Sequence, residues 1–250
     1  MTERWSAPST EREARIELAA AYRMAHDLGW TDLGATHFSL AVPGEPDAYL
    51  MLRAGLFFDE VTASNLVKVS VDGDVRDHGD VALALVNPAG VTIHSAVHEG
   101  RPDVQSVMHT HSPAGVAVSC HPDAMLPLSQ HSMRFYEGHG IHGYEGVALD
   151  EDEGPRLALD LGDHELLVLR NHGLLTVGCD VPSAFSALYY AEMAAEMQVA
   201  ALAGTHEPVT PPHDVCAHTR KQFDASSGYM YRDWQGVLRH VRRNHPDFAD

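Results

Sequence analysis

The sequence predicts a single α/β domain in which helices cover both faces of a sheet. Three observations support this fold class: short apolar strands alternate with longer helices, no internal repeat is visible, and no low-complexity linker divides the 250 residues. The one candidate boundary is Thr210–Pro212, and the segment that follows it is too short to fold alone. We therefore expect one domain over residues 1–250, with a core at 8–204 and a C-terminal helical extension at 205–250.

The first part of the chain predicts one helix followed by short strands. A polar cap at Ser9 or Thr10 begins a helix that runs to Leu28, where Gly29 ends it. Strands are expected at His37–Val42, Ala48–Leu52 and Leu66–Val71. A loop at Asn87–Gly90 then leads through Val91–Ile93 to one or two helical turns at His94–Glu99.

The rest of the chain alternates between strands and helices. Val104–Met108 predicts a strand, after which Ser112 caps a short helix with Pro113 at its first position and Ala114–Ser119 behind it. Strands are also expected at Leu166–Leu169 and Leu174–Val177, and helices at Arg156–Leu161, Val181–Gly204 and Tyr229–Arg243, with Pro208–His213 as a turn-rich linker.

Composition and charge narrow the classes of function. Asp plus Glu number 35 and Lys plus Arg 17, a formal net charge of −18, which repels nucleic-acid phosphates and anionic lipid headgroups. No apolar run approaches the roughly 18 residues of a membrane span, and the charged N-terminus has no signal-peptide pattern. Cys120, Cys179 and Cys216 are scattered, which is typical of a reducing compartment. We therefore expect a cytoplasmic protein whose partner is a small-molecule substrate, with no nucleic acid and no membrane.

Three of the 18 histidines stand at the ends of predicted strands. His109 and His111 are two apart, so both rings are expected on one face of a parallel-type strand end, where α/β folds place their ligands. His172 follows the apolar strand Leu166–Leu169 and precedes a glycine. Three neutral imidazoles that meet from two strand ends would form a catalytic type of metal site with an open position. A surface position is the alternative for each histidine taken singly.

Three stretches of the chain carry a family resemblance. They read H-S-A-V-H-E-G-R-P-D-V-Q-S-V-M-H-T-H-S-P-A-G-V-A-V-S at His94–Ser119, H-G-Y-E-G-V-A at His142–Ala148, and R-N-H-G-L-L-T-V-G at Arg170–Gly178. These motifs resemble the class II aldolase/adducin family. The resemblance implies a three-layer α/β/α sandwich with a mixed, antiparallel-rich central sheet, and a homotetramer with active sites near subunit interfaces.

The same resemblance implies a divalent metal held by three histidines. Carried over position by position, the ligands are His109, His111 and His172. Imidazole sites accept several first-row metals, so the expected ion is Zn²⁺ or Fe²⁺, with Mn²⁺ or Co²⁺ as alternatives.

The chain departs from the sugar-phosphate aldolases of this family at the positions that matter most to them. Gly90 stands where those enzymes carry a glutamate that neighbours the metal and transfers protons. T-H-F-S at Thr36–Ser39 replaces one phosphate-binding loop, and M-L-R-A-G at Met51–Gly55 with N-P-A-G at Asn87–Gly90 replaces the other. Without those donors a phosphate would be poorly held, so a non-phosphorylated substrate is expected.

The replaced segments supply candidate substrate-binding residues. Arg53 is suited to pair with a substrate carboxylate in place of the lost phosphate loop. His37 takes the place of the loop asparagine, and Ser39 ends the same segment. A surface position is the alternative for Arg53.

Proton transfer needs another group, because Gly90 has no side chain. The segment Ser129–Gly146 gathers titratable residues in a loop-like region, which fits a pocket wall, with a polar surface loop as the alternative. His131 and His142 are the first candidates because adducin-like bacterial members also carry histidine there, and Tyr136 comes next. His94 and His98 have the spacing of a helical metal pair, although in this family that helix packs near the site without ligating.

The sequence leaves three functions open. The first is a divalent-metal lyase that performs aldol-type cleavage or decarboxylation of a small non-phosphorylated carboxylate or hydroxy-carbonyl compound, with the metal as a Lewis acid that stabilises an enolate. The second is a non-haem Fe(II), O₂-dependent oxygenase that oxidatively decarboxylates an aryl keto or hydroxy acid at the same site. The third is a non-catalytic, adducin-like scaffold. The complete triad favours an enzyme, since the eukaryotic adducins lack it.

Overall fold

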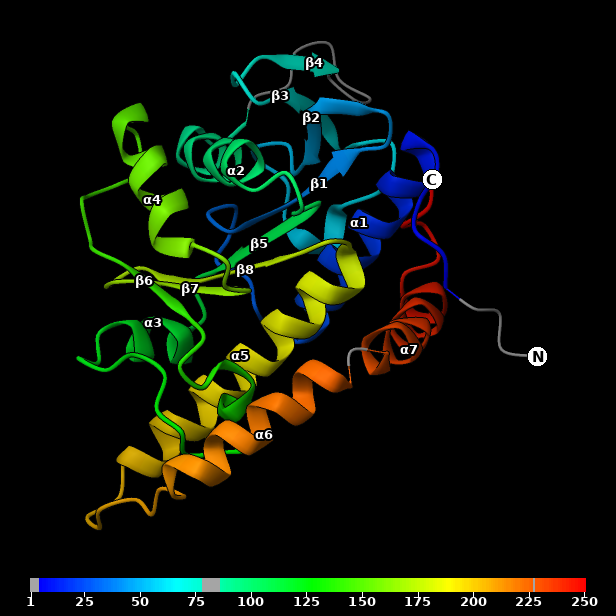
Figure 1. Cartoon of the computed structure of the whole chain (residues 1–250). Coiled ribbons are helices and arrows are strands. Elements are labelled where there is room, and N and C mark those ends of the chain that lie inside the picture. The colour runs from blue at the N-terminus through cyan, green and yellow to red at the C-terminus, as the bar shows by residue number, and fades with distance from the viewer. Residues whose placement is uncertain (1–4, 78–85, 227) are drawn as a thin grey trace.

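A mixed sheet forms the centre of the protein. The computed structural model describes residues 5–77, 86–226 and 228–250, and the described residues form eight strands in the order β4-β3-β2-β1-β5-β8-β7-β6 (Figure 1). The strands are β1 (His37–Val42), β2 (Glu45–Met51), β3 (Val67–Ser70), β4 (Val75–Asp77), β5 (Ser106–Thr110), β6 (Gly140–His142), β7 (Leu166–Leu169) and β8 (Gly173–Gly178). The mixed sheet and its helices confirm the predicted α/β class.

The direction of β5 corrects one sequence-based expectation. Only β6 and β7 pair in parallel among the described strands. Strand β5 lies between β1 and β8 and is antiparallel to both. The expectation that His109 ends a parallel-type strand is therefore wrong, and the position of the site rests on a different arrangement of strand ends.

Helices cover both faces of this sheet (Figure 1). Their bounds are α1 (Glu11–Asp27), α2 (Pro88–Gly100), α3 (Pro113–Ser119), α4 (Gly154–Leu161), α5 (Val181–Leu202), α6 (His213–Ala225) and α7 (Tyr229–Asn244), with short 3₁₀ turns η1 (Phe58–Glu60), η2 (Ser132–Phe135) and η3 (Glu151–Glu153). One face packs against α2 and α4, and the other packs against α1, α3, α5 and α7. This three-layer arrangement requires strands that are apolar on both sides.

Strand β7 shows how alternation serves the two cores. Leu167 and Leu169 point to the layer of α2 and α4, whereas Leu166 and Val168 point to the layer of α3 and α5. All four side chains are buried. Because successive side chains of a strand face opposite sides, a continuous apolar run is what a doubly covered strand needs.

The Asn87–Gly90 segment is the start of a helix, which corrects the predicted loop. Asn87 is the N-cap of α2, and its side chain accepts a hydrogen bond from the backbone N–H of Ala89 at 3.1 Å. Pro88 occupies the first turn, where its missing N–H costs nothing. Val91–Ile93 is therefore helical as well, and His94 and His98 lie on one continuous helix.

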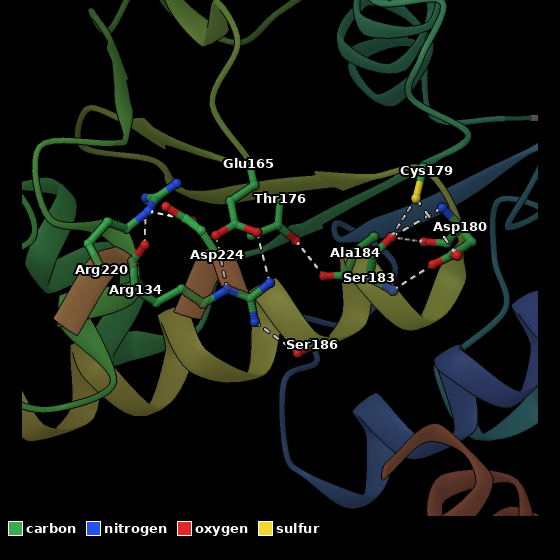
Figure 2. Close-up of polar contacts among 10 residues, drawn as sticks. All are labelled: Arg134, Glu165, Thr176, Cys179, Asp180, Ser183, Ala184, Ser186, Arg220 and Asp224. Atoms are coloured by element: carbon green, nitrogen blue, oxygen red, sulfur yellow. Dashed lines mark hydrogen bonds and ion pairs between the residues drawn. The ribbon is translucent and has the colours of Figure 1, made fainter. Parts of the chain in front are cut away.

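Helix α6 lies within the predicted helical extension at 205–250, but its own bounds were not predicted, because its sequence carries only a thin apolar stripe. Cys216 is its one buried residue. A polar anchor holds the helix instead: Arg220 donates to the backbone carbonyl of Arg134, at 2.5 Å, and Arg134 of η2 pairs with Glu165 at 2.8 Å (Figure 2). Polar contacts of this kind between distant segments are not visible as a sequence period.

Helix α7 returns the chain to the first layer. Trp234, Leu238 and Val241 are buried in the same apolar cluster as helix α1 and strands β1 and β2. The apolar spacing of these residues agrees with the predicted helix over Tyr229–Arg243. Among the described residues, no helix combines the length and apolarity that crossing a membrane would require.

Candidate metal centre

One edge of the sheet gathers most of the predicted site residues. Because β1 is antiparallel to β5, and β5 to β8, the start of β1, the end of β5 and the start of β8 lie at the same edge. His37 begins β1 and is the register partner of His109, and His172 immediately precedes β8. His142 ends β6, which runs parallel to β7 and so reaches this edge too.

The imidazoles of His109, His111 and His172 meet at this edge. Nε2 of His109 lies 2.8 Å from Nε2 of His111 and 3.2 Å from Nε2 of His172. One nitrogen from each ring lies within 4.8 Å of the others. The described residues contain no second group of three histidine, cysteine or carboxylate ligands at such short distances. The three residues are called the triad below.

The far nitrogens of two rings fix which nitrogen faces the centre of the triad. Nδ1 of His109 donates to the carbonyl oxygen of Leu174 at 2.9 Å, and Nδ1 of His111 faces Oδ2 of Asp32 at 3.0 Å. A neutral imidazole has one N–H, so each Nε2 is left with a lone pair directed into the triad. Such outer contacts orient histidine ligands in metal sites.

Burial keeps the rings of His109 and His172 neutral. Burial in the protein, with the neighbouring histidines as a smaller cause, holds the pKa of His109 well below its ordinary value. Burial likewise lowers the pKa of His172 to about 4. Unprotonated nitrogens that face one another at hydrogen-bond distance repel unless a proton or a cation lies between them. The donor set and its geometry therefore fit a divalent transition metal, with His111 and His172 open on one side to solvent.

A buried carboxyl group from another layer supports the triad. Glu192 of α5 accepts hydrogen bonds from the hydroxyls of Thr110 and Ser112, which flank His111. Ser112 in turn caps α3 by accepting from the N–H of Gly115 at 2.9 Å. Sequence reasoning missed Glu192, although a single acidic residue on the buried, alanine-rich stripe of a helix was a usable signal. Asp32 was missed too, and nothing in its sequence context indicates it.

One predicted substrate residue, His37, lies directly beside the triad, and a second, Ser39, lies farther in along the same strand. The ring of His37 is buried, and its centroid lies 5.2 Å from that of His109. Nδ1 of His37 lies 2.8 Å from Nε2 of His94. Ser39 is also buried, and its hydroxyl contacts His94 and His98. His94 and His98 thus bond to strand β1, and neither joins a group of three metal ligands in the described residues.

The three predicted acid–base residues occupy different places. His142 lies at the triad's edge of the sheet, with Nδ1 2.8 Å from Asp160 and Nε2 3.3 Å from Glu153. His131 and Tyr136 flank η2, the turn whose Arg134 anchor Figure 2 shows. The ring of His131 lies 5.1 Å from that of Tyr190 on α5, and the hydroxyl of Tyr136 lies 2.9 Å from Nδ1 of His213 on α6. No polar contact among the described residues joins His131 or Tyr136 to the triad.

Comparison with known proteins now gives the family. Residues 16–199 match the model of the Class II Aldolase and Adducin N-terminal domain. The chain belongs to the class II aldolase/adducin family. A Caulobacter vibrioides relative named "Putative aldolase class 2 protein" is 41% identical over 242 residues, which cover 96% of this chain and 93% of that protein.

Two solved structures share the fold of this class II aldolase family member. An aldolase II superfamily protein from Pseudomonas syringae is 46% identical, with a TM-score of 0.90 over 98% of both chains. An L-fuculose 1-phosphate aldolase from Glaciozyma antarctica is 26% identical, with a TM-score of 0.84 over 95% of this chain and 92% of that one. Class II aldolases use a divalent metal, typically Zn²⁺, which agrees with the triad.

In this family member the His37 ring leaves no room for a side chain at position 90. A Cβ atom on Gly90 would lie 2.8 Å from Cδ2 and 2.9 Å from Nε2 of His37, closer than real Cβ contacts. The His37 ring therefore occupies the space that any side chain at position 90 would need. With the His37 ring in this position, residue 90 must be a glycine.

The segments that replace the phosphate loops hold two buried polar atoms without partners. Nε of Arg53 and Oγ1 of Thr36 make no hydrogen bond to any described residue. Thr36 immediately precedes β1, and Arg53 lies two residues beyond the end of β2, which is antiparallel to β1. Both therefore lie at the triad's edge of the sheet, where unpaired donors are suited to a polar ligand.

Proposed function

We propose that this protein is a divalent-metal-dependent lyase that acts on a small, non-phosphorylated carboxylate or hydroxy-carbonyl compound. The observation that carries the proposal is the triad, with three neutral imidazoles whose lone pairs converge at an open edge of the sheet. Family membership supports a lyase of the aldolase type. Aldol-type cleavage and decarboxylation both leave negative charge on the substrate carbon, which becomes an enolate.

His109, His111 and His172 would hold the ion, Zn²⁺ or Fe²⁺ with Mn²⁺ or Co²⁺ as alternatives. A divalent ion at this position supplies Lewis-acid stabilisation of the enolate charge. Because all three ligands are neutral, the ion keeps its full charge toward an anionic substrate.

We propose that the substrate-binding part of the site is formed by Arg53, His37 and Ser39. The unpaired Nε of Arg53 supports a role in pairing with a substrate carboxylate. His37 is close enough to the triad to touch a ligand bound there. Ser39 acts through the histidines that its hydroxyl contacts.

For proton transfer we propose His142, with His131 and Tyr136 as further candidates. His142 shares the edge of the sheet with the triad, and its two ring nitrogens face the carboxylates of Asp160 and Glu153. His131 and Tyr136 contact α5 and α6 within the chain, so they would serve a site only where a second copy approaches. That role belongs with the proposed homotetramer, whose active sites would lie near subunit interfaces.

Metal reconstitution tests the lyase proposal. The protein is stripped with a chelator, reloaded under nitrogen with Zn²⁺, Mn²⁺, Co²⁺ or Fe²⁺, and assayed on hydroxy and keto carboxylates and on sugar phosphates while oxygen uptake is recorded. We expect cleavage or decarboxylation of a non-phosphorylated compound without oxygen consumption, and loss of turnover and of bound metal in His109→Ala and His172→Ala. His218→Ala, an exposed histidine of α6, is the matched control and should bind metal normally.

Other outcomes would decide against the lyase. Turnover that needs Fe²⁺ and consumes O₂ in proportion to product would indicate the oxygenase at the same site. Purified protein without stoichiometric metal, unaffected by His109→Ala, would indicate the adducin-like scaffold. Sedimentation of the wild type as a monomer would contradict the homotetramer.

A further inference from the structure

The loop that follows strand β6 presents apolar side chains to solvent. Within residues 143–149, Tyr144 is 58% exposed, Val147 67% and Leu149 58%. Single exposed apolar residues are normal on a protein surface, whereas three of them in one short loop indicate contact with another molecule. This segment is called the 143–149 loop below.

The 143–149 loop is held in place from behind. Ala148 is buried in the apolar cluster of α2 and α4. The carboxylate of Glu145, the one charged side chain of the loop, is neutralised by Arg156 of α4 at 3.0 Å. The backbone groups of Tyr144 and Gly146 make no backbone hydrogen bond with any other described residue. A fixed loop with free backbone groups has little conformational entropy to lose when it docks.

A cavity of about 550 Å³ lies between helix α6, η2 and α5. Its lining includes the rings of Tyr190, Phe223 and Tyr229, and the centroids of the first two are 5.4 Å apart in an edge-to-face contact. Gln130 and Gln222 border the same cavity with their side-chain amides. The cavity is called the α6 cavity below. Its walls combine aromatic surface with groups that can bond a peptide backbone.

Net charge restricts where two copies of this protein can meet. Each copy carries a formal charge of −18, so two copies repel least where the facing surfaces lack acidic side chains. The described residues that line the α6 cavity include no charged side chain. Other cavities carry acidic residues, namely Asp224 and Asp233 in one, Asp72 and Glu99 in a second, and Asp47 in a third. The α6 cavity is therefore suited to a neutral, apolar segment of another copy.

A chain cannot place its own 143–149 loop in its own α6 cavity. Ala148 anchors the loop on the sheet face covered by α2 and α4, whereas α6 lies beside α5 on the opposite face. Figure 1 shows α4 above the sheet and α6 below it. An occupant with the chemistry of this loop must therefore come from a second copy. Because the two surfaces differ, the contact is head-to-tail, and contacts of that kind can close into rings.

We propose that the 143–149 loop of one copy docks into the α6 cavity of the next, and that this contact builds the homotetramer. Tyr144, Val147 and Leu149 fill the cavity with apolar surface. Gln130 and Gln222 bond the loop backbone that is free in the single chain. The inference rests on the proposed homotetramer for the number of copies, and it is independent of the reaction that the protein performs.

The contact also bears on the proposed site. Tyr144 lies two residues after His142, which ends β6 at the triad's edge of the sheet. Gln130 of the cavity immediately precedes His131. Docking therefore brings η2 of one copy toward the strand end that carries His142 of the other. This is the approach of a second copy that a role of His131 in proton transfer requires.

Sedimentation of single variants tests the contact. Wild type is expected to sediment as a tetramer, and Val147→Asp in the loop and Val215→Asp in the cavity as monomers, because an unpaired charge is costly to bury in an uncharged cavity. Both positions are exposed in the single chain, so circular dichroism and zinc content should stay as in wild type. Leu159→Asp, at an apolar residue of α4 that is 79% exposed and lies outside the loop, is the matched control and should remain tetrameric. A monomeric wild type, or a tetramer that survives either substitution, would overturn the proposal.

A charge pair tests whether these two surfaces face one another. Val147→Asp combined with Val215→Lys places opposite charges on the two sides of the contact. The double variant should therefore regain the tetramer that Val147→Asp alone loses. Persistence of the monomer in the double variant would overturn the pairing of the loop with the cavity.

Cross-linking tests the head-to-tail arrangement. The exposed cysteines are first removed by Cys120→Ser and Cys179→Ser. A short bismaleimide should then join Val147→Cys chains to co-expressed Val215→Cys chains, and should join neither variant to itself. Linking of Val147→Cys to itself would indicate a symmetric contact and overturn the arrangement. Because none of these measurements requires substrate or turnover, failure of the lyase proposal would be recognised separately.

Discussion

At this edge of the sheet, the hydrogen-bond partner of each histidine determines which ring nitrogen it presents to the triad. His109 presents Nε2 because the Leu174 carbonyl takes its other nitrogen, and His111 does so because of Asp32. Gly90 matters through the ring of His37, which fills its side-chain space. The printed sequence names these residues, but the contacts that decide their proton positions come from segments distant in the chain.

Glu17 of α1 is a second residue whose surroundings decide its charge. Its Oε1 accepts from the indole N–H groups of Trp5 at 2.5 Å and Trp234 at 3.1 Å, whereas Oε2 is buried without a partner among the described residues. Burial raises the pKa of Glu17 to about 7 from its ordinary 4.5, and the nearby charge of Asp180 adds to the increase.

This shift predicts a pH dependence of stability. The folded protein holds the Glu17 proton more tightly than the unfolded chain does, so this stabilisation is fully present below about pH 4.5 and is lost as the pH rises through about 7. The ionised group at pH 8 then costs up to about 3 kcal/mol. Glu17→Gln should lose less thermal stability than wild type between pH 5 and pH 8. If the thermal stabilities of the two proteins changed in parallel with pH, this prediction would be contradicted. Glu196→Gln, at an exposed position of α5, is the control.

Two contacts join secondary-structure elements next to the triad. One is the pair of hydrogen bonds that Glu192 accepts, called the clamp below, and the other is a close approach between two strand backbones. Glu192 ties α5 to the turn between β5 and α3. A Cβ on Gly173 would lie 2.2 Å from the carbonyl oxygen of Thr110, so β8 and β5 approach as closely as they do because residue 173 is glycine. The first contact lies on both sides of His111 in the sequence, and the second lies next to His172.

The clamp predicts a graded response to substitution. Glu192→Ala leaves two buried hydroxyls without their acceptor, and we expect a loss of about 2 to 4 kcal/mol in the free energy of unfolding. Glu192→Gln keeps one acceptor oxygen and should lose about half as much. Zinc affinity, measured by competition with a chromophoric chelator, should fall in the same order. Unchanged zinc affinity in a folded Glu192→Ala protein would show that the clamp does not position His111, and Glu196→Ala, at the exposed position one turn along, serves as control.

At the scale of the whole molecule, the two ends of the chain pack together. Helix α7 buries Trp234, Leu238 and Val241 against α1 and α5, and the backbone N–H of Ser64 donates to the carbonyl of Asp250 at 2.8 Å. Figure 1 shows the C-terminus beside α1. Residues 205–250 are therefore expected to unfold together with the predicted core at 8–204.

A core substitution in α7 tests that expectation. Trp234→Ala removes a buried indole and should lower the free energy of unfolding by about 3 to 5 kcal/mol. The loss should be seen in one urea transition, followed both by circular dichroism and by triad accessibility to a zinc chelator. Tyr229→Ala, an exposed position at the start of the same helix, should change stability little. Two separate transitions in Trp234→Ala would show that the C-terminal segment is an independent unit.

Local sequence patterns determined much of the architecture. The strand over Leu166–Leu169 matches its predicted bounds. Thr10, one of the two cap positions predicted for the first helix, and Ser112 are both N-caps. The three triad histidines were identified from spacing and family motifs. Each of these features depends on residues close together in the chain, where side-chain period and capping chemistry decide the outcome.

Tertiary structure decided the rest. The direction of β5 and the helix at His213–Ala225 depend on strand pairing and on polar anchors that outweigh the local apolar pattern. Glu192 and Asp32, which support the site, come from segments that meet the triad only in the folded protein. Hydrogen bonds between residues 50 or more positions apart leave no period in the sequence, so the protonation of the site could be derived only from the fold.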